Sequence, residues 1–326
     1  MMTPRFDIIP AFRRWLVITC ILAWVGAVLF FSNLRFSIEF TWGLQLTLDT
    51  PEVTAEVEDR IENSLREQGF TANDVEVGER DGYPTILMQA ALESAEEIDG
   101  ITSAIVEVLI AEGVIGSKDD ILEQAVIGPS VGDYVRRSAT NALLLWLLFM
   151  AIYILFAFAS MRHFISPAML GLITIVTMLF DVLVPAGAYG VLMAFNPAAQ
   201  VDMIFVIALL TIMGYSINDT IIILDRVREN FGLYKGKIEK WQMSRKDVYE
   251  MSVWQTMRRS IGTSLSTFFV VVVMFIFGTW VLKLFAFVLW FGILAGSFSS
   301  IFIAAPLAYV LSGKEKGTSK EKADKK

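Results

Sequence analysis

The chain has 326 residues, of which 55% are hydrophobic and only 19% are charged, and its mean hydropathy is +0.57. This composition is too apolar for an ordinary soluble domain and predicts a polytopic membrane protein. A single cysteine, Cys20, and a single histidine, His163, exclude an intrachain disulfide and a cysteine-based metal cluster, and they leave little room for a histidine metal site. We therefore expect no metal and no cofactor.

The apolar residues gather in blocks of the length that crosses a bilayer. A spanning helix needs ~20 apolar residues, and six segments come close to or exceed that length. These predicted spans are residues 15–31, 139–159, 167–193, 201–224, 261–282 and 284–311. The fold class that follows is a polytopic α-helical membrane protein with six transmembrane helices.

The charges predict how the chain crosses the membrane. Residues 33–136 hold 6 basic and 22 acidic residues, a net charge of −16, whereas the rest of the chain carries +9, for a total of −7. The basic residues outside this region cluster before the first span, at Arg162, in the loop 225–260 and in the tail 312–326. Six spans bring all of these to one side, which the positive-inside rule makes cytoplasmic. Both termini are then cytoplasmic, and residues 33–136 are extracytoplasmic.

The polar region between the first two spans has the pattern of a small α+β domain. Strand-like alternation and helical spacing of apolar residues follow one another in the order β-α-β-β-α-β, which is that of a ferredoxin-like domain. The predicted strands are residues 44–48, 75–77, 85–88 and 122–127, with a hairpin turn at Asp81-Gly82, and the predicted helices are residues 53–68 and 94–112. We interpret the acidic residues of this region as a solvated face. The alternative is a face that binds cations or basic substrates. The chain is thus divided into residues 1–32, 33–136, 137–311 and 312–326.

Four polar residues lie within predicted spans or at the mouth of one. Asp181 lies near the middle of the third span, Asn218 and Asp219 are neighbours in the fourth, and Arg259 precedes the fifth. A central Asp costs ~2.5–3.5 kcal/mol, so these groups must face protein or water. A carboxyl group in apolar surroundings can become neutral and is poised to take up and release a proton. Asp181 and Asp219 are therefore candidates for an ion pathway.

Each polar residue also has a structural interpretation. Asn218 can join helices by hydrogen bonds, and Asp181 and Asp219 can serve as buried hydrogen-bonding groups. Thr263 and Ser264, early in the fifth span, usually bond back to their own helix in such positions, and they are supporting candidates only.

Three further residues are expected at helix ends and helix contacts. Asp202 stands at the start of the fourth span, where N-capping is the default role and support of the ion pathway is the alternative. Gly292 and Gly296 form a G-x-x-x-G pattern in the last span, which favours close helix packing.

The stretch GYSINDTIIILDRVREN, residues 214–230, resembles the signature of the SecF family of protein-export membrane proteins. Other matches to that family follow in chain order from residue 127 to the last span. They are Ile127-Gly128-Pro129-Ser130-Val131-Gly132 before the second span, Phe180-Asp181-Val182 in the third, Val201-Asp202 at the start of the fourth, and QTMRRSIGTS, residues 255–264, before and within the fifth.

Two places depart from the family pattern. The family's G-I-D-F-T-G-G after the first span is Ser37-Ile38-Glu39-Phe40-Thr41-Trp42-Gly43 here, with Glu39 for Asp and Trp42 for Gly. Arg259 is followed by Ser260 where the family has Thr. The first change bears on the join between the outer domain and the membrane, and it does not touch the carboxyl group of the fourth span.

The resemblance implies a half-transporter of the resistance-nodulation-division superfamily in the cell (inner) membrane. Its implied partners are a SecD-like subunit, a SecYEG-type translocation channel, unfolded preprotein and membrane lipid, and proton or sodium flow would drive export. By position, Asp219 would be the principal ion carrier with Asn218 beside it, Arg259 would assist, and Asp181 would support.

Two other functions remain open from the sequence. A proton-driven exporter of small molecules or lipids, acting as a homo-oligomer, would use the same helical scaffold. A membrane-anchored scaffold would leave Asp181 and Asp219 unexplained. No nucleotide-binding loop and no pairing of nucleophile with base is recognisable, so we expect neither an enzyme nor a nucleic-acid-binding protein.

Overall fold

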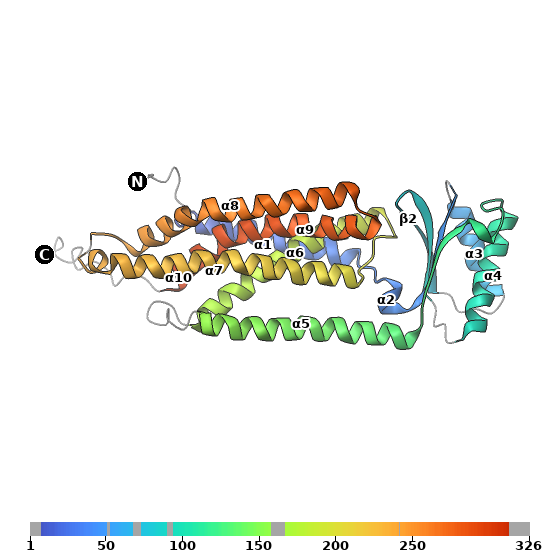
Figure 1. Cartoon of the computed structure of the whole chain (residues 1–326), viewed down its shortest axis with the longest axis horizontal. Coiled ribbons are helices and arrows are strands. Elements are labelled where there is room, and N and C mark those ends of the chain that lie inside the picture. The colour runs from blue at the N-terminus through green and yellow to red at the C-terminus, as the bar shows by residue number, and fades with distance from the viewer. Residues whose placement is uncertain are drawn as a thin grey trace.

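A computed structural model describes residues 8–50, 53–67, 73–89, 94–157, 167–240 and 242–312. The molecule is elongated, with a bundle of long helices at one end and a sheet covered by two helices at the other (Figure 1). Most of the tail 312–326 and Arg162, which entered the charge argument, lie outside the described residues.

The small domain is the predicted α+β domain. Its strands are β1 (Gly43–Leu48), β2 (Asn73–Arg80), β3 (Tyr83–Gln89) and β4 (Ile121–Ile127), and its helices are α3 (Ala55–Glu67) and α4 (Ala95–Ala111), with the short 3-10 turn η1 (Lys118–Asp120) before β4. The sheet is antiparallel with the order β2-β3-β1-β4, and its register pairs Leu46 with Ile86 and with Gln124. The β-α-β-β-α-β prediction is confirmed.

Alternation along the strands decides which face of this sheet is covered. Leu44, Leu46 and Leu48 of β1 point to the same side, where they join α3 and α4 in one apolar core with Ile61 and Ile105. The opposite face of the sheet is turned toward the helix bundle (Figure 1). Contacts between the domain and the bundle must therefore use that second face and the strand ends.

Among the described residues, six helices of the bundle are long and apolar enough to cross a membrane. They are α1 (Phe12–Ser32), α5 (Pro129–Ala157), α6 (Pro167–Phe195), α7 (Met203–Glu239), α8 (Arg245–Phe277) and the series α9 (Trp280–Ser299), η3 (Ser300–Ala304) and α10 (Ala305–Leu311). The prediction of six spans on one polytopic chain agrees with this arrangement.

The boundaries of the later spans differ from the prediction. Residues 225–260 are not an irregular loop: α7 continues to Glu239, and α8 begins at Arg245 with a capping box at Ser244. Val248 and Tyr249 of the α8 extension are fully buried, so this stretch packs into the bundle core. A search for apolar runs misses these helical extensions because they carry charged residues. A helix does not need apolar residues on every face.

The last span is interrupted where composition gave no sign of it. Residues Ser300–Ala304 form a π-helical turn between α9 and α10. Such turns are rare, occur mostly singly within α-helices and are frequent at functional sites. This one follows directly on Ser299, which is completely buried.

A short connector joins the two parts of the molecule. After α1, Ser37 donates its backbone N–H to the carbonyl of Val201, and Val201 donates to the carbonyl of Arg35, so the chain entering the domain pairs with the chain entering α7. Helix α2 (Ile38–Thr41) follows and ends at Trp42, which has a positive φ of 56°. Glycine adopts a positive φ at lower cost than Trp does. This difference gives a physical reason for the Gly that the family pattern has where this chain has Trp42.

Candidate functional site

The first buried carboxyl group of the bundle is Asp219 on α7. Its side chain is only 2% exposed, and its Oδ2 accepts a hydrogen bond of 2.6 Å from the hydroxyl of Ser260 on α8. The guanidinium of Arg259 lies near enough to act on it electrostatically, but no ion pair joins the two in the described part of the chain. Asp219 is thus held in apolar surroundings by one neutral donor, with a positive charge at some distance.

The second buried carboxyl group is Asp181 on α6, which is completely buried. The hydroxyl of Ser216, on α7, donates to its Oδ2, and Ser299 at the end of α9 also interacts with it. Ser216 precedes Asp219 by three residues, which corresponds to ~4.5 Å along a helix. The α7 residue that bonds to Asp181 therefore lies about one helical turn before Asp219.

Hydroxyl groups connect α7 to the last span and to α8 around these acids. Thr220 and Ser300 place their hydroxyl oxygens 3.3 Å apart. Tyr215 donates to Ser264 at 3.0 Å, and Ser264 lies 2.6 Å from the hydroxyl of Ser297. Buried hydroxyls that bond between helices hold a specific arrangement, since each would be costly to leave unpaired.

The structure brings together only some of the residues that were singled out in the sequence. Asp219 is near Arg259, and Asp181 is held by a neighbouring turn of α7, but Asn218 points away from Asp219 and is exposed on the bundle surface. Adjacent residues on a helix face different directions, which separates Asn218 from its neighbour. Ser264 joins three helices and also bonds back to the carbonyl of Ser260, and Thr263 bonds back to the carbonyls of Arg259 and Ser260.

The residues expected at helix ends and contacts have these roles in the structure. Asp202 is the N-cap of α7, and its Oδ1 accepts from the backbone N–H of Phe205 at 2.7 Å. A Cβ atom on Gly292 would lie 2.2 Å from the side chain of Ile212, and one on Gly296 would lie 3.0 Å from Ser216. Helix α9 therefore approaches α7 closely beside the Asp181 cluster.

Several polar contacts at the domain end of the bundle were not predicted as a site. Glu39, noted only as a departure, accepts the backbone N–H of Met203 at 2.8 Å and so provides a second cap for α7. Asp81, interpreted only as a turn residue, accepts from the backbone of Trp280 and pairs with Lys283. Acidic residues in a turn give no sign in the sequence that their partner is a helix end far along the chain.

Arg80 of β2 lies near the same end of α7. Burial lowers the pKa of its guanidinium, and the carboxyl groups of Glu123, Asp202 and Glu39 oppose this effect. The result is a partly buried charged cluster between the sheet and the start of α7. Within the part of the chain that the structure describes, no group of three His, Cys, Asp or Glu residues is placed to hold a metal ion.

Fold and site together define a polytopic membrane protein with Asp181 and Asp219 buried inside its bundle and a ferredoxin-like domain at one end. Residues 111–314 match the family described as protein export membrane protein SecD/SecF, C-terminal. The chain belongs to this SecD/SecF family of protein-export membrane proteins.

Similar proteins of known sequence and structure cover nearly the whole chain. The protein translocase subunit SecF of Endomicrobium trichonymphae is 30% identical over 286 residues, which are 87% of this chain and 83% of that protein. The subunit SecDF of Thermus thermophilus is 29% identical over 99% of this chain, but only 41% of its own length is covered. The crystal structure of a Thermus SecDF, described as translocon-associated, superposes with a TM-score of 0.74 at 28% identity, over 94% of this chain and 38% of that one.

Proposed function

We propose that this chain is the SecF-type half of an ion-driven unit that helps to export unfolded preproteins through a SecYEG-type channel. The observation that carries the proposal is Asp219, a carboxyl group that is 2% exposed among apolar helices and held by the hydroxyl of Ser260. Buried acids of this kind within membrane bundles mark ion pathways in general. The proposed coupling ion is a proton or sodium.

The energetics suit small repeated steps. One charge that crosses 100 mV provides ~2.3 kcal/mol, which is enough to shift a helix arrangement but not to unfold a cargo. A charged Asp219 favours water or Arg259, whereas a neutral one accepts apolar packing. This difference in free energy biases one arrangement of α7 and α8 over another, as a ligand biases a conformational equilibrium.

The surface of the bundle supports a partner with helices of its own. Exposed Thr211, Gly214 and Asn218 recur along one side of α7, and exposed Arg259 and Gly262 lie on α8. Polar groups at membrane depth are unfavourable against lipid and suit contact with other helices. The SecDF relative, of which this chain covers 41%, has room for such helices in a single chain. We therefore propose a SecD-like subunit as the partner on this side.

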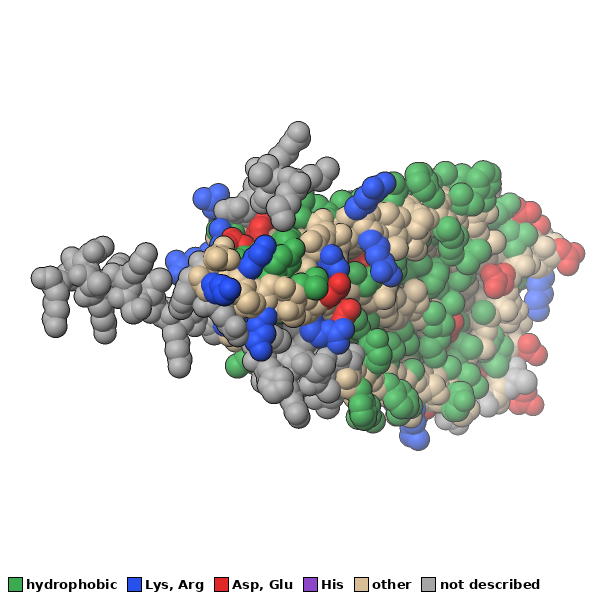
Figure 2. All heavy atoms as spheres, turned by 60° about the vertical axis from the view of Figure 1, so that its left-hand side comes forward, with side chains coloured by type: hydrophobic (Ala, Val, Ile, Leu, Met, Phe, Trp, Pro, Cys, Tyr) green, Lys and Arg blue, Asp and Glu red, His purple; other side chains and the backbone are tan. Residues whose placement is uncertain are grey.

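The charge distribution supports an orientation in the cytoplasmic (inner) membrane. Lys and Arg side chains gather at the bundle end remote from the sheet, where residues 225–260 lie, and acidic side chains appear toward the other end (Figure 2). Under the positive-inside rule the basic end is cytoplasmic. The α+β domain then lies outside, where an exported chain emerges.

The test is replacement of Asp219 by Asn, which keeps its size and removes its titration. We expect late-stage preprotein export, driven by the membrane potential, to fall to the level of a strain without the protein. Asp225→Asn is the matched control, because Asp225 lies on the same helix but is exposed and paired with Arg228 at 2.6 Å. Export at the normal rate by Asp219→Asn, with the potential intact, would refute the proposal.

A further inference from the structure

The tip of the β2–β3 hairpin reaches the bundle at the start of α9. Asp81 and Gly82 form the turn, both with positive φ, and Arg80 pairs with Tyr83 on either side of it. The Asp81 carboxylate accepts the backbone N–H of Trp280 at 2.7 Å and forms an ion pair of 2.6 Å with Lys283. An element of the domain thus holds the first turn of a bundle helix.

This contact replaces a cap that α9 does not supply itself. The residue at the N-cap position, Thr279, makes no hydrogen bond to the helix through its side chain. An acidic side chain at a helix N-terminus satisfies a free N–H group and interacts favourably with the helix dipole. Asp81 provides both effects from 199 positions away in the chain. Docking of the hairpin therefore stabilises the start of α9.

Helix α9 links the hairpin to the buried Asp181 cluster. Its 20 residues correspond to ~30 Å at 1.5 Å per residue. Along this length it packs on α7 at Gly292 and Gly296, and its last residue, Ser299, interacts with Asp181. The π-helical turn begins at the next residue, Ser300, so α9 is bounded by the hairpin at one end and by an irregular turn at the other. A shift of α9 at either end is carried to the other end by one continuous helix.

The hairpin also contacts the segment between α6 and α7. Glu79 of β2 exchanges two hydrogen bonds with the side chain of Asn196, of 3.1 and 2.8 Å, through its backbone alone. Gly78 packs so closely on Ala198 that a Cβ would lie 2.3 Å from the backbone there. The side chains of Asp81 and Lys283 are 35% and 36% exposed. Water can replace each partner of that ion pair at low cost, so the pair can open without a large loss of free energy.

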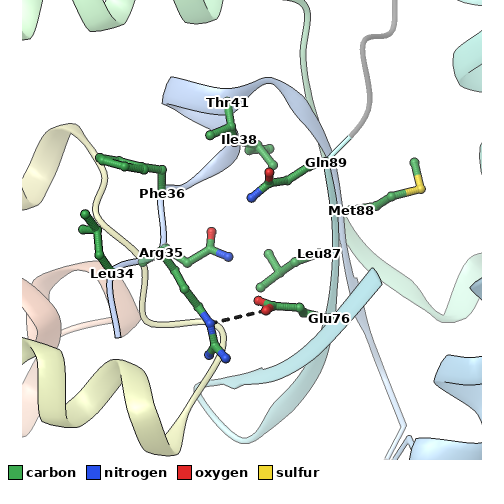
Figure 3. Close-up of a pocket in the computed structure, with 10 residues that line it drawn as sticks. Leu34, Arg35, Phe36, Ile38, Thr41, Glu76, Leu87, Met88 and Gln89 are labelled. Carbon is green, nitrogen blue, oxygen red and sulfur yellow. Dashed lines mark ion pairs between the residues drawn. The ribbon is translucent and has the colours of Figure 1, made fainter. Parts of the chain in front are cut away.

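The sheet has free space beside it on the same side as the bundle. A cavity of about 240 Å³ lies between β2, β3 and the connector after α1, lined by residues that include Glu76, Leu87 and Gln200. Figure 3 shows Arg35 and Glu76 facing each other at this cavity as an ion pair. The Nε atom of Arg35 lies 3.3 Å from the Oε1 atom of Glu76. Tilting of the sheet over its Asn196 contact would be taken up in this space without breaking a packed core.

We propose that the contact of Asp81 with Trp280 and Lys283 is a latch between the α+β domain and α9, which opens when a change in the charge of Asp181 displaces α9. The proposal deepens the proposed function and rests on it, because an ion must reach the bundle for Asp181 to change its charge. The latch is closed in the structure described. The two-state element is the hairpin, docked or undocked, and the shared helix α9 is what allows Asp181 to bias it.

The test measures the latch directly and does not depend on export. Spin labels are attached at Tyr83→Cys and Val281→Cys, two exposed positions next to the contact, with Cys20 replaced by Ser. The full chain is reconstituted with its SecD-type partner in liposomes, and the distance between the labels is measured by EPR with and without an imposed proton gradient. We expect the ratio of closed to open latch to fall about tenfold on energisation, a change of ~1.4 kcal/mol.

The variants separate the latch from a merely structural contact. Asp181→Asn should keep the closed distance under both conditions, whereas Asp133→Asn, an exposed acid paired with Arg136 on α5, should respond like the parent. Lys283→Gln should populate the open distance even without a gradient. A distance that is unaffected by the gradient, while Asp219-dependent export is intact, overturns the latch and leaves the proposed function standing. A response that persists in Asp181→Asn overturns the link between Asp181 and the hairpin.

Discussion

Ser260 on α8 donates a hydrogen bond of 2.6 Å to Asp219 on α7, and both residues are almost completely buried. The pair unites the GYSINDT stretch with the segment QTMRRSIGTS through one contact between helices. A departure from the family pattern, Ser260 in place of Thr, keeps the hydroxyl that this contact needs. The change thus retains the hydrogen-bond donor and removes only a methyl group.

Replacement of Ser260 by Ala should slow preprotein export about tenfold, because a hydrogen bond to a charged group contributes ~1.5–3 kcal/mol. Ser260→Thr is the matched variant, which keeps the hydroxyl and should export at close to the normal rate. Export rates in membrane vesicles at a fixed potential provide the measurement. Equal rates for the Ala and Thr variants would show that the hydroxyl does not act on Asp219.

The docking of Asp81 on α9 should weaken in acid. Partial burial opposes ionisation of Asp81, but hydrogen bonds from Lys283 and from the Trp280 backbone overcome it and lower the pKa of this carboxyl below its ordinary value of 3.8. The contribution of a depressed acid is present above the unfolded pKa and is lost as pH falls through the folded one. We expect no change between pH 7 and pH 5 from this group, and loss of docking only below ~3.8.

The thermal unfolding midpoint of the full chain, followed from pH 7 to pH 3, checks this dependence. Asp81→Asn should lower the midpoint at pH 7 slightly, since an ion pair of this exposure contributes ~0.2–1 kcal/mol, and it should remove the loss in acid. Asp133→Asn should retain that loss. The same acid dependence in Asp81→Asn as in the parent would assign the effect to another group.

Replacement of Glu250 by Ala should release the segment before α1. The two carboxylate oxygens of Glu250 accept the backbone N–H groups of Ile8 and Ile9 at 2.8 and 2.9 Å, and Trp254 donates at 3.2 Å. Leaving such buried donors unpaired costs ~1–3 kcal/mol. Limited proteolysis should cleave near Ile8 faster in Glu250→Ala, and Glu250→Gln, which retains one acceptor, should be intermediate. Identical cleavage of all three would mean that apolar packing alone holds the segment.

Replacement of Gly292 by Val should destabilise the bundle. The added side chain would meet Ile212 of α7, since even a Cβ would lie 2.2 Å from it. Overpacking of this kind costs ~1–3 kcal/mol when neighbours must move. Gly262→Ala on α8, where nothing lies within 4 Å of an added Cβ, is the control and should unfold at the parent temperature. Thermal unfolding in detergent compares the three, and an unchanged midpoint for Gly292→Val would show that Ile212 yields freely.

Composition and periodicity were enough to predict the spans and the small domain. Apolar blocks of bilayer length and the alternation in β1 are local signals, because a helix or strand displays its buried face in its own sequence. The boundaries were less accessible, as residues 225–260 show: the helical extensions of α7 and α8 are charged on their outer sides and lack the apolar run that marks a span. The π-helical turn at Ser300 likewise has no local signature.

The sequence by itself determined that Asp181 and Asp219 lie among apolar residues, and hence that they need protein partners, because burying an acid is costly wherever it occurs. Only the tertiary structure decided which residues are the partners of these acids. Ser216, Ser260 and Ser299 come from separate helices, and Asp81 meets Lys283 from 202 positions away in the chain. Such contacts depend on the packing angles and depths of whole helices, which no short stretch of residues specifies.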